Sequence, residues 1–477
     1  MSEKWIVLKF GGTSVAGRKQ WETISSIVQA RRTEGFRVLL VCSAVAGVTN
    51  QLTALAYKPD STRRLQELLD VHQNLALELE VEESHWLQDA REQLGLCLQN
   101  LTHDPGPMSR AALLALGEWM STRIGCCFLR QHLDAAWVDA REALVTVSGE
   151  QLSPARRWLS AACNAAEAPG LASRWSTLSP VLITQGFVAR SPEGQTALLG
   201  RGGSDTSAAL LAGRLSASRL EIWTDVPGLF SADPRLIDDA RLLNEVGYSE
   251  ALEMAASGAK VVHPRCIRAA AATATPVVIR DLNRRDVPGT QIGQRLAPHN
   301  GIKAVICKQQ MAVILLENLD ARFQVGFLAD VFDTFRRRGI SVDLVATSET
   351  TTTVAIDCQA NHLGKEELAD LVEDLVVRCK VRLFRDCVCV NLVGQGARTA
   401  LSRIQSVMSY FEERPLLMAS QSANDLCLSL LIEEGEHEQL LKSAHAALIP
   451  ADVGGADPVF GPSWRRIQPL ADRVQSL

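Results

Sequence analysis

The sequence predicts an α/β protein with one large domain followed by two small modules of ferredoxin-like βαββαβ order. Three observations lead to this prediction. At 477 residues the chain is about three typical domains long. Short apolar runs rich in β-branched residues alternate with helix-compatible stretches up to about residue 295. After Asn300 a strand, helix, strand, strand, helix, strand pattern appears, and it then recurs.

The large domain is predicted over residues 1–295 and begins with a βαβ unit. Residues 5–10 and 38–42 are strand-like, and the segment 21–32 between them suits a helix. Because strands joined by a helix pair in parallel, a parallel sheet is expected. Residues 61–100 carry leucines at helical spacing among many charges, which indicates an amphipathic helical insertion. Further strand-like runs lie at residues 181–184, 220–223 and 277–279. They alternate with Ala-rich helical stretches.

The two modules are predicted over residues 303–385 and 386–449, because the second stretch repeats the order of elements of the first. Residues 450–477 follow them as a tail. Prolines and glycines recur in this tail and break any regular pattern, so it is predicted to be linker-like. A linker of this kind can lead into a further domain of a longer chain.

Charge and composition narrow the classes of function. The 49 Lys and Arg against 54 Asp and Glu give a net charge of -5 without a dense basic run, so nucleic acid is not an expected partner. The start of the chain lacks the apolar core of a signal peptide, and the apolar runs are too short to span a bilayer. We therefore expect a cytoplasmic protein with no membrane partner. The 12 cysteines form no C-x-x-C pair and are expected to be reduced thiols, not metal ligands.

The first two predicted strands end in candidate ligand-binding loops. Lys9 is followed by Gly11 and Gly12, where the missing side chains let backbone N–H groups approach a phosphate and the lysine adds positive charge. The loop matches neither the P-loop nor the dinucleotide-binding pattern, and a purely structural turn is the alternative. Small and hydroxyl-bearing residues from Ser43 to Thr49 follow the second strand, at the edge where open α/β sheets bind ligands. An ordinary strand-to-helix turn would look similar.

Later motifs add charged residues. Arg201 and Asp205 flank a glycine pair that opens a helix, which combines a cation suited to carboxylate or phosphate with an acid. A turn with Asp205 as a helix cap is the structural alternative. Two further charged loops follow the strand-like run at 220–223, and they contain Thr224, Asp225, Arg235 and Lys260. Each motif alone is compatible with an ordinary loop.

The joint order of these motifs resembles the aspartokinases, members of the amino-acid kinase family. The resemblance extends from Lys9 to about Ile432, with motifs in the family's order at residues 9–14, 43–50, 116–121, 200–205, 224–235 and 258–264. It implies a three-layer αβα sandwich for residues 1–295 and ACT domains for the two modules. It also implies transfer of the γ-phosphoryl group of ATP to the β-carboxylate of L-aspartate, with Mg²⁺. The product, 4-phospho-L-aspartate, begins lysine, threonine and methionine biosynthesis.

The resemblance assigns roles to individual residues. Lys9 and Lys260 would flank the migrating phosphoryl group, and Asp205 would orient them and the substrate ammonium. The implied ATP-binding residues are Lys9, Gly11, Gly12, Thr224, Asp225, Phe230, Arg235 and Lys260; relatives often carry tyrosine at the position of Phe230. The implied aspartate-binding residues are Ser43, Thr49, Glu118, Arg201 and Asp205. Without its motif, Glu118 would be interpreted as a solvated helix residue. No protein ligand is expected for Mg²⁺, and no general base is needed because a carboxylate nucleophile is already ionised.

Regulation is implied by the same resemblance. ACT domains commonly bind amino acids at an interface between modules or subunits, so a homodimer or a dimer of dimers is expected. L-Lysine is the expected inhibitor, because one set of residues resembles the effector loop of lysine-sensitive aspartokinases. Threonine is the alternative. These residues are Gly326, Phe327, Leu328, Ala329, Val342, Asp343, Ser348 and Glu349. The structural alternative is a loop that merely starts a helix. In such enzymes a segment like 303–307 can supply the first strand of the second module, whose residues 421–425 depart from the family pattern.

Two other classes of function compete with this interpretation. Another amino-acid kinase could act on glutamate or an acetylated relative, but the Glu118 motif and the paired ACT-like modules favour aspartate. A non-catalytic amino-acid sensor is disfavoured by the intact set of Lys9, Asp205, Arg201 and Lys260. Some aspartokinases are fused to homoserine dehydrogenase or diaminopimelate decarboxylase, and the tail is compatible with such a bifunctional protein.

Overall fold

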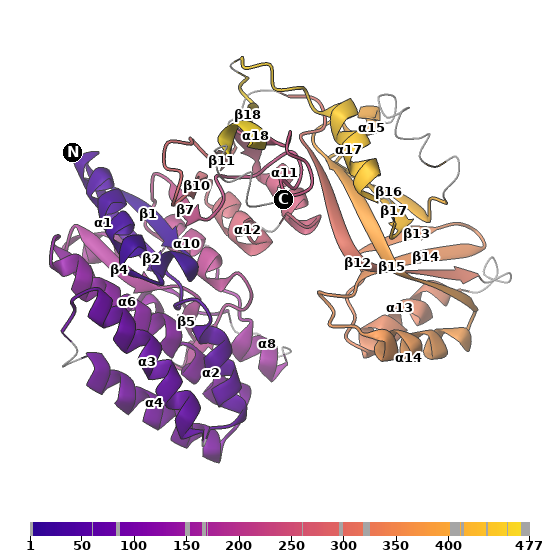
Figure 1. Ribbon diagram of the computed structural model, residues 1–477. Coiled ribbons are helices and arrows are strands. Elements are labelled where there is room, and N and C mark those ends of the chain that lie inside the picture. Colours follow the sequence, from indigo (N-terminus) through magenta and orange to yellow (C-terminus); the bar gives the residue numbers. More distant parts are fainter. Residues whose placement is uncertain are drawn as a thin grey trace. The chain divides into compact units, whose positions relative to one another are not determined.

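The computed structural model describes most of the chain, in two compact units (Figure 1). The first unit comprises Met1–Leu229, Asn244–Tyr248 and Lys260–Leu296, and the second comprises Phe230–Leu243, Ser249–Ala259 and Ala297–Leu477. The residues that the structure describes are 3–59, 61–82, 86–147, 153–164, 168, 170–259, 261–294, 299–317, 325–400, 411, 415–435, 437–455 and 457–468.

The first unit is built on an eight-stranded sheet. Its strands are β1 (Lys4–Phe10), β2 (Phe36–Cys42), β3 (Ala135–Trp137), β4 (Val181–Gln185), β7 (Leu220–Thr224), β9 (Glu245–Gly247), β10 (Val277–Asp281) and β11 (Thr290–Gly293). Their order is β3-β4-β2-β1-β7-β10-β11-β9. β1 pairs in parallel with β2 and with β7, which confirms the predicted βαβ unit and parallel sheet. Successive side chains of β1 and β2 are buried on both faces, which explains their apolar sequences.

Helices surround this sheet, and β5 (Val188–Arg190) and β6 (Thr196–Leu198) form a separate hairpin. The predicted helical insertion at 61–100 is confirmed, since α3 buries an apolar face that includes Leu68 and Leu75. The helices are η1 (Thr13–Val15), α1 (Arg18–Thr33), α2 (Val48–Tyr57), α3 (Thr62–Glu78), α4 (Trp86–His103), α5 (Pro107–Leu114), α6 (Leu116–Arg130), α7 (Ala140–Ala143), α8 (Pro154–Leu159), α9 (Leu171–Ser176), α10 (Gly203–Arg214) and α12 (Pro264–Ala272).

The stretch Pro107–Arg130, which contains α5 and α6, is long and apolar enough to cross a membrane by length and composition. Arg110, Glu118 and Arg123 interrupt it, so the sequence shows no continuous apolar run. Of its most apolar window, 72% is buried inside the protein. Core helices of globular proteins share this composition, so we interpret the stretch as a core helix of the first unit.

Trp21 fixes the distance between α1 and α6. Its side chain is fully buried, and its Nε1 donates to the carbonyl of Val15 at 3.1 Å. A Cβ placed on Gly125 of α6 would lie 1.9 Å from the indole ring. Position 125 therefore accepts only glycine while Trp21 keeps its place.

We expect Gly125→Ala to destabilise the protein by about 1 to 3 kcal/mol, because the added methyl group overpacks the core against Trp21. Gly95→Ala on α4 is the matched control, since nothing lies within 4 Å of its added Cβ. That control should leave stability unchanged or raise it slightly, because alanine favours helix by about 1 kcal/mol over glycine. Thermal unfolding of the two variants measures the difference, and equal unfolding midpoints would contradict the packing account.

The second unit contains a six-stranded antiparallel sheet of order β13-β14-β12-β15-β17-β16. These strands are β12 (Ala304–Glu317), β13 (Leu344–Thr347), β14 (Thr351–Asp357), β15 (Lys380–Val393), β16 (Met418–Gln421) and β17 (Cys427–Glu433). A two-stranded sheet pairs β8 (Arg241–Leu243) with β18 (Phe460–Ser463). The helices are α11 (Tyr248–Ala256), whose first residue belongs to the first unit, α13 (Phe327–Arg337), α14 (Lys365–Val376), α15 (Ala397–Ala400), α17 (His437–Leu448) and α18 (Trp464–Ile467).

Both predicted modules share the two long strands β12 and β15. Residues 304–308 of β12 pair with 389–393 of β15, and these β15 residues also pair with β17. Residues 311–317 of β12 pair with β14 and with the start of β15. The expected strand at 303–307 therefore pairs within the second module's half of the sheet. In the second module α15 follows β15, and residues 401–410 lie outside the described residues.

The first module has its own hydrophobic core. α13 and α14 cover one half of the sheet and enclose buried apolar side chains that include Ile314, Val331, Phe335 and Leu371. The module boundaries 303–385 and 386–449 remain predictions, because the two shared strands run through both halves.

The prediction of a linker-like tail over 450–477 is wrong for residues 457–468. β18 pairs with β8, and Val459 and Phe460 are only 2% and 1% exposed. The prolines and glycines shape a compact loop instead, in which Asp452 accepts the backbone N–H of Gly454 and that of Ser463. Residues 469–477 lie outside the described residues.

Candidate active site

The loops after β1 and β2 touch each other at the carboxyl end of the parallel strands. The backbone N–H of Ser43 donates to the carbonyl of Phe10 at 3.1 Å, and that of Ala46 donates to Gly12 at 3.2 Å. A Cβ on Gly12 would lie 2.7 Å from the carbonyl oxygen of Ala44. Gly12 therefore permits a backbone approach that a side chain would prevent.

Lys9 and Asp205 form an ion pair at this edge of the sheet. The Lys9 Nζ lies 2.5 Å from the Asp205 Oδ1, and the two side chains are 12% and 14% exposed. A Cβ on Gly11 would lie 3.7 Å from the same ammonium, so the lysine reaches over the glycine loop. The structure thus brings together three residues that the resemblance assigns to phosphate binding and catalysis.

Asp205 is placed by the glycine turn that opens α10. Gly202 has a left-handed φ of +65°, and a Cβ there would lie 2.3 Å from the His263 ring. Burial and the Arg265 charge lower the pKa of His263, while the Asp205 charge acts in the opposite direction. His263 is therefore a neutral packing group at neutral pH. Its place before Pro264, as the N-cap of α12, is the signal in the sequence that marks this position.

Two buried thiols lie close enough to the ion pair to feel its charge. Burial raises the pKa of Cys42 to about 12, partly offset by Lys9. Burial also raises the pKa of Cys266 well above its usual range. Both thiols are buried and in no disulfide, and they stay protonated at neutral pH.

Glu118 is a buried acid in the first turn of α6. Glu118 is only 3% exposed. Burial raises the pKa of its carboxyl to about 8, in spite of a hydrogen bond from the Ala44 backbone that lowers it. Its Oε2 has no hydrogen-bond partner among the described residues. A cation placed beside this carboxyl would favour its ionised form.

The start of α6 is held against the loop that carries Ser43. The Ser121 hydroxyl donates to the Ser43 carbonyl at 2.8 Å, and a Cβ on Gly117 would lie 3.0 Å from that of Ala44. Thr49 lies in the first turn of α2, half-buried. The predicted substrate residues Ser43, Thr49 and Glu118 therefore come from one packed corner of the first unit.

The remaining predicted residues are less enclosed. Arg201 is exposed in the loop before α10, and its charge contributes to the lowered pKa of His263. Thr224 ends β7, and its hydroxyl donates to the exposed Asp225 carboxylate at 3.0 Å. Lys260 lies outside the described residues.

Phe230 and Arg235 belong to the second unit. The Phe230 ring packs edge-on against Trp464, with ring centroids 5.6 Å apart. Arg235 is exposed and pairs with Asp233 at 2.7 Å, an interaction that raises the pKa of the arginine. Their roles in nucleotide binding remain predictions.

The expected effector residues lie at the start of α13 and on either side of β13. Phe327 is buried in the module core, while Leu328 is exposed beside it. Ser348 and Thr351 hydrogen-bond to each other in the turn that carries the exposed Glu349. Val342 packs against the same core as Phe327.

Asp343 takes part in an ion cluster that the sequence did not reveal. The Lys308 Nζ lies 2.7 Å from Asp343 and 3.1 Å from Asp357, and Asp343 also accepts the backbone N–H of Asp357. Burial alone would lower the pKa of Lys308, but the two carboxylates raise it above its usual value. Two acids share one lysine, so the cluster keeps a net negative charge.

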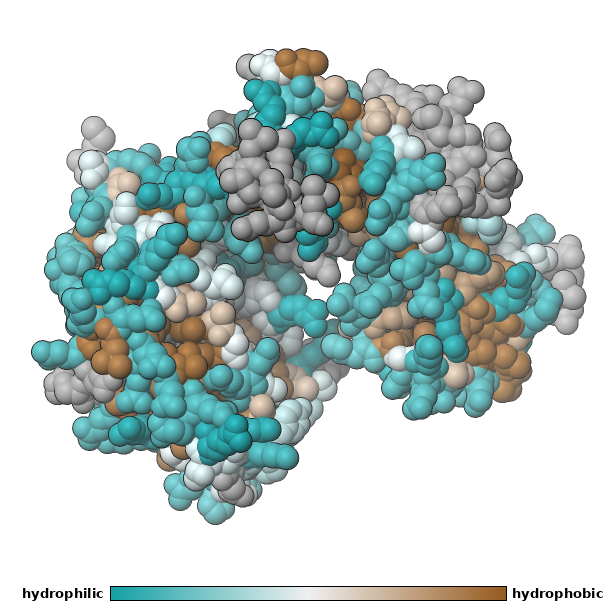
Figure 2. Space-filling view, viewed as in Figure 1, coloured by the Kyte–Doolittle hydropathy of each residue, from teal (hydrophilic) through white to brown (hydrophobic). Residues whose placement is uncertain are grey.

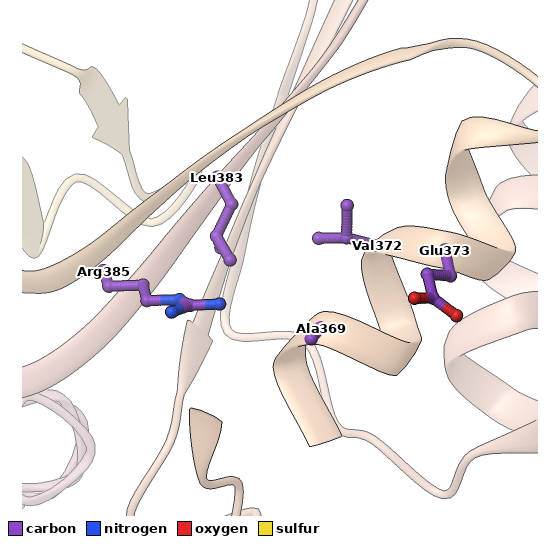
Figure 3. Close-up of a pocket in the computed structure, with 5 residues that line it drawn as sticks. All are labelled: Ala369, Val372, Glu373, Leu383 and Arg385. Atoms are coloured by element: carbon purple, nitrogen blue, oxygen red, sulfur yellow. The ribbon is translucent and has the colours of Figure 1, made fainter. Parts of the chain in front are cut away.

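A pocket of about 590 Å³ lies between α14 and β15 of the second unit (Figure 3). Figure 3 shows Arg385 reaching from the sheet toward the side of α14 that carries Ala369 and Val372. The lining of this pocket contains no predicted site residue. Within the part of the chain that the structure describes, no group of three or more His, Cys, Asp or Glu side chains could hold a metal ion.

Comparisons with known proteins agree with this geometry. Residues 4–281 match the amino acid kinase family, and the chain belongs to that family. Aspartokinases are among its relatives. The chain is 31% identical to lysine-sensitive aspartokinase 3 of Escherichia coli over 453 residues, covering 93% of this chain and 99% of that protein. It is 28% identical to chloroplastic aspartokinase 2 of Arabidopsis thaliana, covering 94% of this chain and 84% of that protein.

Solved structures lead to the same family. The crystal structure of E. coli aspartokinase III in complex with aspartate and ADP matches with a TM-score of 0.76 at 31% identity, over 94% of this chain and 100% of that chain. The same enzyme in complex with lysine and aspartate matches with a TM-score of 0.74 over equal shares. The predicted family and fold class are therefore confirmed.

The raised pKa of Glu118 predicts a pH-dependent stability. The folded protein holds this proton up to about pH 8, whereas an unfolded glutamate releases it near 4.5. Its stabilising contribution is therefore complete below about pH 4.5 and is lost as the pH rises through about 8. We expect Glu118→Gln to gain stability relative to the wild type between about pH 5 and 8.5, in thermal unfolding without ligands.

Glu92→Gln on the exposed surface of α4 is the control and should show no such trend. A stability difference between Glu118→Gln and wild type that stays constant with pH would contradict the buried, proton-holding carboxyl.

Proposed function

We propose that this protein is an aspartate kinase, which transfers the γ-phosphoryl group of ATP to the β-carboxylate of L-aspartate and forms 4-phospho-L-aspartate. The observation that carries the proposal is the shielded Lys9–Asp205 pair over a glycine loop at the carboxyl end of the parallel sheet. A relative with 31% identity was solved with aspartate and ADP bound, which supports the same substrates here.

The chemistry asks for positioning and charge neutralisation. A phosphoryl group in transfer carries negative charge on its oxygens, and Lys9 can neutralise part of it from a site with little water. Asp205 holds the Lys9 ammonium in place through the ion pair. Lys260 is proposed as a second cation. The aspartate carboxylate is ionised at neutral pH, with an ordinary pKa of about 3.9, so no base has to activate it.

Nucleotide contacts are proposed for the loop glycines and for the segment after β7. Gly11 and Gly12 offer backbone N–H groups to the phosphates, while Thr224, Asp225, Phe230 and Arg235 border the nucleotide. Mg²⁺ would neutralise charge on the phosphate oxygens. We propose that the nucleotide and water hold the ion, as the resemblance to the aspartokinases implies.

Aspartate recognition needs partners for two carboxylates and one ammonium. Glu118 is proposed to receive the ammonium, because it is a buried acid of the first unit with an oxygen that lacks a hydrogen-bond partner among the described residues. Arg201 is proposed to bind a carboxylate through its forked donors. Ser43 and Thr49 add hydrogen-bond donors at the same corner.

Regulation by L-lysine is proposed for the second unit. The E. coli relative is lysine-sensitive and was solved with lysine bound. The net negative charge of the Lys308, Asp343 and Asp357 cluster suits a further cationic group.

Figure 2 shows hydrophobic residues gathered on the second unit. Exposed apolar side chains include Val325, Leu328 and Val345, so we propose that the first module forms a subunit interface in a dimer or a dimer of dimers.

We expect Lys9→Ala to lower the rate of aspartyl phosphate formation by roughly 100-fold or more, because it removes a preorganised cation from the transition state. Hydroxylamine trapping of the acyl phosphate measures the product. Lys19→Ala, an exposed lysine of α1, is the control and should keep wild-type turnover. ATP-dependent product with glutamate but not aspartate would favour another amino-acid kinase, and no product in the wild type would favour a sensor.

We expect Asp343→Ala to raise the lysine concentration needed for half inhibition by about 10-fold or more, since it removes a charge-assisted contact. Uninhibited turnover should change by less than about 2-fold. Asp374→Ala, which removes an exposed ion pair with Arg338, serves as the control. Equal inhibition of all three proteins would contradict the effector role of Asp343. A wild type that ignores lysine would overturn only the regulatory proposal.

A further inference from the structure

The segment 230–243, which carries two of the proposed nucleotide residues, is held by the C-terminal residues 450–468. We name these residues the C-terminal clamp. The clamp supplies β18, which pairs with β8 at the end of the segment. Its backbone N–H groups at Trp464 and Arg465 donate to the carbonyls of Ala240 and Asp238, at 2.8 and 2.9 Å. All these residues belong to the second unit.

Arg241 is the centre of this attachment. The residue is 4% exposed, and its guanidinium donates to carbonyls of the clamp instead of to an acid. The acceptors are the carbonyls of Gly461 at 2.6 Å, Phe460 at 2.8 Å, and Pro450 and Ala451 at 3.0 Å. A buried cation needs such partners, so this position and the clamp depend on each other.

Ser231 closes the segment on itself and ties it to the module. Its backbone N–H donates to the Arg241 carbonyl at 2.8 Å, and its carbonyl accepts from the Val305 N–H at 2.7 Å. Its hydroxyl hydrogen-bonds the His445 ring of α17 at 2.8 Å. Burial lowers the pKa of His445 to about 4; the Asp239 charge raises this pKa and the Arg241 charge lowers it. The ring is therefore neutral at neutral pH. The hydrogen bond therefore persists over the physiological pH range.

Trp464 connects the clamp to the proposed nucleotide site. Its indole packs edge-on against the Phe230 ring, at 5.6 Å between centroids. Phe230 lacks the hydroxyl of a tyrosine and has no polar anchor for its ring. The position of that ring therefore depends on aromatic packing with Trp464.

We propose that the C-terminal clamp positions Phe230 for the nucleotide through Trp464. The clamp would then contribute to ATP affinity without touching ATP. The proposal rests on the nucleotide role proposed for Phe230. Trp464 is thus a positioning residue: it should affect binding of the nucleotide and leave aspartate recognition and the chemical step unchanged.

The test uses the full chain and steady-state kinetics. Trp464→Ala should raise KM for ATP by about 5- to 20-fold while kcat and KM for aspartate change by less than about 2-fold. Trp464→Phe keeps an aromatic ring and should restore most of the affinity. Lys442→Ala, on the exposed face of α17, is the control and should match the wild type. Phe230→Ala should raise KM for ATP as Trp464→Ala does, and the double variant should add little more.

The outcomes separate the clamp from the proposed function. If Phe230→Ala raises KM for ATP and Trp464→Ala does not, the clamp proposal is overturned while the nucleotide role of Phe230 stands. If neither variant changes KM for ATP but Lys9→Ala abolishes turnover, both the role of Phe230 and the clamp fail, and the kinase proposal survives. If Trp464→Ala lowers kcat, raises KM for both substrates and lowers thermal stability together, the tryptophan has a merely structural role and the clamp proposal is overturned.

Discussion

The close backbone contact between the loops after β1 and β2 is the constraint on which the site depends. Gly12 reaches the carbonyl of Ala44 at a distance that no side chain would allow, and Gly117 lets α6 approach the same loop. Because these glycines bring the loops together, Lys9 and Glu118 are both shielded from water beside one edge of the sheet. Low exposure strengthens the interactions of the Lys9 charge and raises the pKa of Glu118.

The two charged residues are treated differently by the fold. Lys9 has its counter-ion, Asp205, already in place, so its charge is kept in the free protein. Glu118 lacks a cationic partner among the described residues, and its pKa rises to about 8. Under the proposed function, Glu118 exchanges its proton for the ammonium of the substrate, and Lys9 neutralises charge on the phosphates.

Much of this could be predicted from local patterns. Apolar strand runs and the glycine loops after them placed Lys9, Gly12 and Ser43 at one sheet edge, because parallel strands end together. The pairing of Lys308 with Asp343 and Asp357 could not be predicted, since it joins residues from separate strands without a motif. The tail was misjudged because composition cannot show that Arg241, some two hundred residues earlier, supplies donors for its carbonyls. The roles of Phe230 and Arg235 rest on family resemblance, and their contacts within the second unit had no signal in the sequence.

The most direct test is calorimetric titration of aspartate at pH 7 in buffers of different ionisation enthalpy, which counts protons released on binding. With a pKa of about 8, roughly nine-tenths of Glu118 is protonated before binding, so the wild type should release close to one proton. Glu118→Gln should release almost none and bind more weakly. Binding with no proton release in the wild type, and equal affinity in the variant, would contradict the site described here.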